Sequence, residues 1–368
     1  MIMKKLLLLT GIILSGVQVN CQDIQFPPSG ENQKATTSQS IGLVNVSITY
    51  SRPNVTGPNG EDRRGKIWGG LIPFGQDKGL PWRAGANERT TIEVSHDVLI
   101  DNNKLPAGRY GLMIFVEKLD SWTVIFSRDD IAWGAFGYKK ENDVLRIKCQ
   151  VVDTDYTEWL TYGFDNPTQE KTSVFLKWEN KKITFEIAVP DHRELYVRHF
   201  RDALKKPSVL FHSGNWQWAA DYCADNNLNL EEALTWAERS MAPGIGVETF
   251  STLSTKAKIL KKLNRAEESN TVMDKAVRST TASATNIDGY ARELLSEKNN
   301  QKAYAVFKLN EERFPDQMIP SVGLADYYAA TGDKKQEIRY LQKAIQNANE
   351  RQKARAESLQ KRLDALKG

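Results

Sequence analysis

The sequence contains few of the residues that bind metals or form disulfides. Only 3 cysteines and 4 histidines occur among its 368 residues. This scarcity excludes a disulfide-rich miniprotein, and the ordinary content of 40% hydrophobic and 26% charged residues excludes a disordered chain. The two cysteines beyond the N-terminus, Cys149 and Cys223, fall in different predicted domains, so no disulfide between them is expected.

The sequence also lacks the residue patterns of common catalytic centres. His192 and His199 would lie about 10 Å apart along a helix, too far to share one zinc ion. Ser95, His96 and Asp97 have the order of a triad, but neighbouring residues of a strand point to opposite faces. Phosphate-binding loops, dinucleotide motifs and paired-cysteine zinc motifs are missing. We therefore expect no catalytic residues, no metal and no cofactor.

Charge of one sign does not dominate the chain. Lys and Arg number 50 against 46 Asp and Glu, a net charge of +4. Two of these lysines belong to residues 1–21, and their removal leaves 48 basic residues against 46 acidic ones. A nearly neutral chain lacks the basic surface of nucleic-acid-binding proteins. We therefore expect protein or small-molecule partners and no nucleic acid.

One apolar run stands out, and it lies at the N-terminus. Lys4 and Lys5 precede about ten mostly apolar residues, the pattern of a secretory signal peptide, which is too short to span a membrane. An uncleaved anchor is the competing interpretation. We predict cleavage after Cys21, which makes the protein periplasmic or secreted with no membrane span. Lipid attachment at Cys21 is less favoured, because Val19 and Asn20 lack the small residue that usually precedes a lipidated cysteine.

Apolar and polar residues alternate through much of the first half of the chain. This period of two puts the apolar side chains of each segment on one face of a strand. About eight strands separated by turn residues are predicted, at 44–50, 92–100, 110–116, 122–126, 145–151, 160–164, 174–178 and 183–187. Short strands joined by short turns indicate an antiparallel β-sandwich or jelly roll.

The segment 51–90 carries aromatic and charged residues but little alternation. Long loops inside compact domains are usually functional or mobile, and aromatic faces beside fixed charges suit a glycan, another small molecule or a peptide. In the alternative interpretation, which the frequent burial of aromatics favours, the tryptophans cap the open end of the sandwich and Arg83 pairs with Glu88. The candidate ligand-binding residues are Arg52, Lys66, Trp68, Trp82, Arg83, Asn87 and Glu88.

Several motifs in this half resemble those of DUF2911, a domain of unknown function common in exported proteins of Bacteroidetes-type bacteria. They are Arg52-Pro53, Gly65–Gly69, Leu71–Gly75, Trp82–Glu88, Leu105–Tyr110 and Trp122–Phe126. The resemblance covers about residues 38–188, and the run from Trp82 to Glu88 is its most specific part. The chain departs from shorter members in the extra segments 57–63 and 76–80. The family has no established chemistry, so the resemblance implies no catalytic role.

The second half of the chain repeats itself with a helical period. Each repeat has a small residue, an apolar one four positions later and a small one seven positions later, the pattern of a degenerate tetratricopeptide repeat (TPR). The sets are Ala233, Ala237 and Ser240; Ser269, Met273 and Ala276; Ala303, Phe307 and Asn310; and Glu337, Leu341 and Ala344. Their first members are 36, 34 and 34 residues apart. Stacked helix pairs of this kind form an α-solenoid that offers a surface to partner proteins or acts as a purely structural brace.

These patterns predict an all-β domain followed by an all-α domain. The expected layout is a signal peptide (1–21), an N-terminal extension (22–37), a DUF2911-like β-sandwich (38–190), a linker helix (191–212) and a TPR-like array (213–368). We expect an exported, non-enzymatic binding or scaffold protein, with a protein partner on the repeats and a small-molecule or glycan ligand at the sandwich loops. The alternative is a carbohydrate-active or other hydrolase whose carboxylates, Glu88 and Asp62 with Glu61, would need to lie about 5–9 Å apart.

Overall fold

The chain folds into two compact units. The computed structural model describes residues 32–75, 79–118 and 120–368. The chain divides at residue 192 into Met1–His192, here called the sheet unit, and Arg193–Gly368, here called the helical unit. The expected signal peptide, its cleavage after Cys21 and the lipid attachment there all lie outside the described residues.

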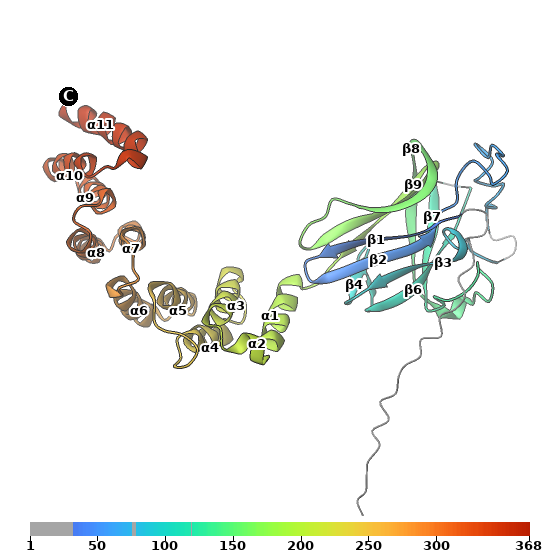
Figure 1. The fold of residues 1–368 in the computed structure, drawn as a ribbon, viewed down its shortest axis with the longest axis horizontal. Coiled ribbons are helices and arrows are strands. Elements are labelled where there is room, and N and C mark those ends of the chain that lie inside the picture. The colour runs from blue at the N-terminus through green and yellow to red at the C-terminus, as the bar shows by residue number, and fades with distance from the viewer. Residues whose placement is uncertain (1–31, 76–78, 119) are drawn as a thin grey trace, which may run out of the picture. The chain divides into compact units, whose positions relative to one another are not determined.

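The described part of the sheet unit contains nine strands, all paired antiparallel (Figure 1). They join in one sheet in the order β1-β2-β3-β6-β7-β8-β9-β4-β5. Because one continuous sheet is formed, the expected sandwich or jelly roll is not confirmed. The strands are β1 (Lys34–Ile41), β2 (Val44–Ser51), β3 (Ala86–Val94), β4 (Val98–Ile100), β5 (Asn103–Leu105), β6 (Gly108–Phe115), β7 (Ser121–Ser127), β8 (Asp143–Asp165) and β9 (Lys171–Ala188).

Two strands are longer than the alternation predicted. The segments expected as separate strands at 145–151 and 160–164 belong to the single strand β8, and those at 174–178 and 183–187 belong to β9. The polar stretch around Asp153 interrupts the alternation without ending the strand. Backbone pairing between β8 and β9 continues there through register shifts between Asp153 and Thr161.

The end of β2 meets the second half of β8, although the two strands are not neighbours in the sheet. The Tyr50 hydroxyl accepts a hydrogen bond from the Tyr162 backbone N–H at 3.1 Å, and the two rings lie 4.7 Å apart. Asn54 forms a backbone bridge with Trp159. The sheet therefore curves far enough for its two halves to touch, and this contact positions the loop that follows β2.

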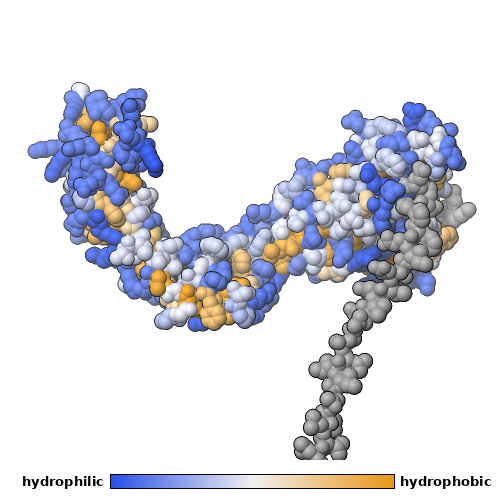
Figure 2. Space-filling model, viewed as in Figure 1, coloured by the Kyte–Doolittle hydropathy of each residue, from blue (hydrophilic) through white to orange (hydrophobic). Residues whose placement is uncertain are grey.

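The helical unit confirms the expected all-α second half. Its described helices pack on each other as consecutive pairs, α3/α4, α5/α6, α7/α8 and α9/α10, and α11 comes last (Figure 1). On the face shown in Figure 2, hydrophilic residues cover most of the last helices, and apolar residues gather between helices. The bounds are α1 (His192–Ala203), α2 (Pro207–Leu210), α3 (Ser213–Asn226), α4 (Leu230–Ser240), α5 (Phe250–Lys262), α6 (Ala266–Arg278), α7 (Ala284–Ser296), α8 (Asn300–Arg313), α9 (Met318–Thr331), α10 (Lys334–Gln346) and α11 (Lys353–Lys367).

The repeat residues lie on the second helix of each pair. Ala233 and Ala237 on α4 and Ala303 on α8 are fully buried, so small side chains occupy the helix contacts as expected. The two departures from the pattern form polar contacts with neighbouring helices. Asn310 on α8 donates to the Ala284 carbonyl of α7 at 2.9 Å, and Glu337 on α10 pairs with an arginine of α11. These polar residues therefore tie neighbouring helices together.

Candidate functional site

Two of the candidate residues, Trp68 and Trp82, belong to a tryptophan cluster inside the sheet unit. The Trp68 ring centroid lies 4.5 Å from that of Trp122, 5.7 Å from that of Trp178 and 5.8 Å from that of Trp82. Trp122 and Trp178 are almost completely buried, and Trp82 donates its indole N–H to the Gly85 carbonyl. Other tryptophans therefore occupy much of the ring surface that a stacked ligand would need.

The side chains of Arg52 and Lys66 form their hydrogen bonds with residues outside the tryptophan cluster. Arg52 donates from Nε to the Leu160 carbonyl and from Nη2 to the Thr161 hydroxyl, both at 2.9 Å. It thus braces the end of β2 against β8. Lys66 is exposed, and its Nζ lies 3.4 Å from the Asp62 carbonyl oxygen.

Arg83, Asn87 and Glu88 share one tight turn before and at the start of β3. Ala84 and Asn87 both have positive φ, 55° and 54°, the left-handed region that non-glycine residues rarely adopt. The Ala84 carbonyl accepts hydrogen bonds from the Thr90 hydroxyl at 3.0 Å and the Tyr162 hydroxyl at 2.9 Å. Buried hydroxyls therefore hold the turn in its strained conformation.

The expected ion pair between Arg83 and Glu88 is not formed among the described residues, so that part of the structural interpretation is wrong. Glu88 instead accepts from the Ser51 hydroxyl at 3.2 Å and lies 3.6 Å from Lys34 Nζ. The left-handed residue between them, Asn87, reverses the chain and separates the two side chains. Burial raises the pKa of Glu88, but its backbone hydrogen bond, Lys34 and Ser51 outweigh that effect and lower it.

Two carboxylates of the hydrolase alternative, Asp62 and Glu88, have lowered pKa values. Hydrogen bonds from Arg64 lower the pKa of Asp62 to about 2, and Glu61 pairs with Arg63. A general acid needs a raised pKa at neutral pH. The environments of Asp62 and Glu88 act in the opposite direction.

A small cavity beside Glu88 contains residues that the sequence did not single out. It measures about 380 Å³ and is lined on its charged side by Lys34, Glu88, Arg109 and Asp130, and on its apolar side by Trp133. Arg109 and Asp130 form an ion pair at 3.4 Å. The loop that supplies Asp130 and Trp133 has no alternation or motif, so only its exposed tryptophan could have drawn attention to it.

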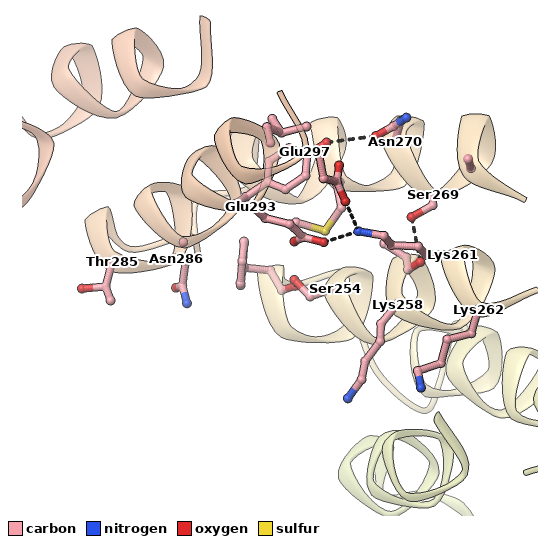
Figure 3. Close-up of a pocket in the computed structure, with 17 residues that line it drawn as sticks. Ser254, Lys258, Lys261, Lys262, Ser269, Asn270, Thr285, Asn286, Glu293 and Glu297 are labelled. Carbon is pink, nitrogen blue, oxygen red and sulfur yellow. Dashed lines mark hydrogen bonds and ion pairs between the residues drawn. The ribbon is translucent and has the colours of Figure 1, made fainter. Parts of the chain in front are cut away.

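A larger cavity, of about 820 Å³, lies in the helical unit between α5, α6 and α7 (Figure 3). Apolar side chains from all three helices form part of its lining: Phe250, Ala257, Met273, Tyr290 and Leu294. Ser254, Asn270 and Asn286 add hydroxyl and amide groups. A second cavity of about 430 Å³ shares Phe250, Ser254, Lys258 and Asn286 with it and continues to α3. Together the two form one groove, here called the α5–α7 groove.

The α5–α7 groove lies where the apolar core of the helical unit is divided. One cluster of buried side chains extends from α1 to Leu260 of α5, and another from Val277 of α6 to α11. In the neighbouring pairs the first helices pack on each other, α3 on α5 and α7 on α9, whereas α5 and α7 scarcely contact one another. The groove is the space between these two helices, which are joined across it by the ion pairs of Lys261 with Glu293 and Glu297.

Most charges at the groove are already neutralised. Lys261 bonds to both Glu293 and Glu297 (Figure 3), and Lys258 pairs with Asp225. Lys262 forms no ion pair or hydrogen bond with its side chain among the described residues. The groove therefore has an apolar surface, polar groups at its sides, one unpaired cation, Lys262, and at its α3 end one carboxylate outside the ion pairs of the described residues, Asp221.

The described residues offer no site of metal type and no helix that could span a membrane. Groups of three or more His, Cys, Asp or Glu placed to hold a metal ion are absent from the described ranges. None of the described helices is both long and apolar enough to cross a membrane. Cys149 and Cys223 are buried free thiols, and burial raises the pKa of Cys149 to about 12 and that of Cys223 to about 11.

An antiparallel sheet followed by an array of helix pairs with an open groove defines the architecture. Residues 32–187 match the family model described as "Protein of unknown function (DUF2911)". This confirms the resemblance stated from the motifs of the first half.

Solved structures of low similarity include repeat proteins. MamA is 13% identical over 45% of this chain and 92% of its own, with a TM-score of 0.34. YrrB, described as a TPR protein with an unusual peptide-binding site, is 17% identical over 43% of this chain and 78% of its own, with a TM-score of 0.30. A MamA fragment from Desulfovibrio magneticus RS-1 is 18% identical over 42% and 87%, with a TM-score of 0.29. A search of curated proteins gives no match.

Proposed function

We propose that the protein is a scaffold whose helical unit binds an extended polypeptide segment in the α5–α7 groove. The observation that carries this proposal is the open space between α5 and α7, at a position where the other helix pairs close against each other. Apolar surface left uncovered at such a size is typical of a binding groove. Its continuation along α3, α5 and α7 gives it the elongated form that suits a chain rather than a compact small molecule.

The chemistry of the lining indicates what the segment carries. An apolar side chain fits against Phe250, Met273 and Leu294, where it would be removed from water. Asn270 and Asn286 can donate through Nδ2 to the C=O groups of an extended segment, while their Oδ1 atoms already accept from Tyr290 and Ser283. Lys262 favours an acidic group at one end. The proposed partner is therefore a segment with an apolar residue and a nearby Asp or Glu.

Gly289 provides the test of this proposal. It lies on α7 in the groove lining, and a Cβ there would meet no atom within 4 Å. Gly289→Leu should therefore fill the groove without disturbing the helix. Gly214→Leu on α3 is the matched control, because Gly214 also faces open space but does not line the groove.

The experiment selects peptides from a random displayed library with the full chain and measures their affinities by fluorescence anisotropy. We expect enriched peptides with an apolar and an acidic residue, at least about tenfold weaker binding to Gly289→Leu, and unchanged binding to Gly214→Leu. Failure to enrich any peptide, or equal affinity for wild type and Gly289→Leu, would contradict the proposal.

We also propose that the protein is exported, as the basic and apolar residues of the first 21 positions indicate. The mass of the protein purified from its native host tests this. Loss of residues 1–21, with Gln22 as the new N-terminus, is expected. A lipid-modified Cys21 or an intact N-terminus would give a different mass and contradict cleavage at that position.

For the sheet unit we propose a two-layered arrangement of the curved sheet and a ligand site at the loops after β2. The contacts between β2 and β8 support the two-layered arrangement, and the strained turn at Ala84 and Asn87 supports the ligand site.

We also propose the domain limits 38–190 and 213–368, with a linker helix at 191–212 between them. Limited proteolysis tests them: first cleavage inside 191–212 is expected, and cleavage inside β3 or α5 would contradict them.

A further inference from the structure

Arg83 and Arg89 lie six residues apart in the sheet unit and differ in how their charges are satisfied. Arg89 is buried and donates to three backbone carbonyls: Asp129 at 2.6 Å, Gly134 at 3.2 Å and Phe136 at 3.2 Å. The Arg83 guanidinium is half-buried, and within the described residues it has no hydrogen bond and no ion pair. Burial lowers the pKa of Arg83, and no neighbouring charge offsets this effect.

A partly buried cation without a partner is unfavourable, so its position needs a cause. The turn that carries it is rigid, because Ala84 and Asn87 are held in left-handed conformations and two hydroxyls bind the Ala84 carbonyl. Gly134 lies directly against the guanidinium. A Cβ at Gly134 would come within 2.7 Å of Arg83 Nη1, and φ there is +68°. The backbone conformations of the turn and of Gly134 therefore leave space for the guanidinium at this position.

The loop next to Arg83 exposes apolar side chains. Phe136 is 72% exposed and lies beside Gly134, where a Cβ would meet its ring at 3.7 Å. Ile131 and Trp133 of the same loop are also exposed. An unpaired cation and an exposed aromatic ring therefore both lie close to the position that a Cβ of Gly134 would take.

We propose that Arg83 binds the carboxylate of a small ligand whose apolar or aromatic body rests on Phe136. A guanidinium forms two parallel hydrogen bonds to a carboxylate. The single positive charge is matched by a monoanion, whereas a phosphate dianion would need a second cation. The nearby basic residues Lys34 and Arg109 are already paired with Glu88 and Asp130. This inference rests on the proposed ligand site of the sheet unit and is independent of the α5–α7 groove.

The test titrates the full chain with phenylacetate, the neutral isostere phenylacetamide, and phenyl phosphate, using calorimetry and thermal shift. Arg83→Met removes the cation and keeps the length of the side chain. Arg109→Gln is the control, because it removes an exposed cation of the sheet unit that is paired with Asp130. Unliganded melting temperatures are measured for all variants, together with Arg89→Met.

We expect saturable binding of phenylacetate, at least about tenfold tighter than that of phenylacetamide. Arg83→Met should abolish the preference and have an unliganded melting temperature equal to or above that of the wild type, since it removes an unpaired cation. Arg109→Gln should keep the preference. A markedly lower melting temperature for Arg83→Met, as expected for Arg89→Met, would show a structural role and overturn the proposal. Equal binding of acid and amide would also overturn it, and so would tighter binding of phenyl phosphate or the absence of saturable binding.

Discussion

The sheet unit and the helical unit differ in the kind of chemical group that each leaves without a partner. In the sheet unit tryptophans pack together in the core, and a half-buried charge, the guanidinium of Arg83, is left without a partner among the described residues. In the helical unit most charges at the groove are paired, and what is left open is apolar surface between α5 and α7. The first arrangement suits one small anionic group held by a rigid turn, and the second suits a longer segment of chain. The two proposed sites therefore differ in their physical basis.

The largest expected effect tests how closely the sheet unit is packed. Arg89→Met leaves the buried Gly134 carbonyl and the partly buried Asp129 and Phe136 carbonyls without their donor, and each such loss costs up to about 1–3 kcal/mol. The free energy of unfolding of the sheet unit should fall by about 3 kcal/mol or more. Urea denaturation followed by hydrogen exchange should show this loss in β3 and β6 and leave the helical unit unchanged. A change below 1 kcal/mol would mean that water replaces Arg89 at these carbonyls.

The next effect concerns the closed part of the helical unit. A Cβ at Gly323 on α9 would lie 2.3 Å from Asp288 Oδ1 and 2.6 Å from the Phe307 ring. Gly323→Ala should therefore destabilise the helical unit by about 1–3 kcal/mol, through overpacking and through disturbance of the bond from Arg292 to Asp288. Thermal unfolding of the purified variant measures this. An unchanged melting temperature would show that α7 and α9 can move apart freely.

Gly289→Ala is the matched change in the open part and should act in the opposite direction. Its Cβ meets nothing within 4 Å, so the helix gains the propensity of alanine, about 0.5–1 kcal/mol. A higher melting temperature than wild type is expected in the same assay. Destabilisation would mean that α5 and α7 close on each other in solution and that the groove is filled.

The smallest effect is a pH dependence at the α3 end of the groove. Burial raises the pKa of Asp221, although the Thr255 hydroxyl, which donates to it at 3.1 Å, partly opposes this. A folded-state pKa above the unfolded one favours the protonated fold, so the contribution of Asp221 to stability declines as pH rises through the folded pKa. Asp221→Asn keeps an acceptor and has no charge. Its melting temperature relative to wild type should increase between about pH 4 and pH 7, and a constant difference would contradict the shift.

The sequence predicted the helical unit better than its groove. Small residues such as Ala233 and Ala303 mark the helix contacts directly, because only small side chains fit there. The groove exists because α5 and α7 do not pack closely on each other, and no residue type in the sequence indicates that two helices stay apart. Gly289, an exposed glycine inside a predicted helix, is the one signal that could have indicated it.

In the sheet unit alternation predicted segments of β2, β3, β4, β6, β7, β8 and β9, but it did not predict β1 or β5. Trp68 and Trp82 pack in the core, and the expected partner of Arg83 was wrong because Asn87 adopts a left-handed conformation that turns Glu88 toward Lys34. Such a backbone reversal depends on buried hydroxyls from distant strands. Phe136 and Trp133 lie about 50 residues from the turn, and only the folded sheet brings their loop to it.

The most direct test of the scaffold proposal is hydrogen exchange of the full chain with and without a selected peptide, with a scrambled peptide as control. The account predicts slower exchange in α5 and α7, at residues 250–262 and 284–296, no change in the loop 129–138, and loss of this protection in Gly289→Leu. Protection confined to the sheet unit, or protection of α5 and α7 that persists in Gly289→Leu, would contradict the assignment of the α5–α7 groove as the binding site.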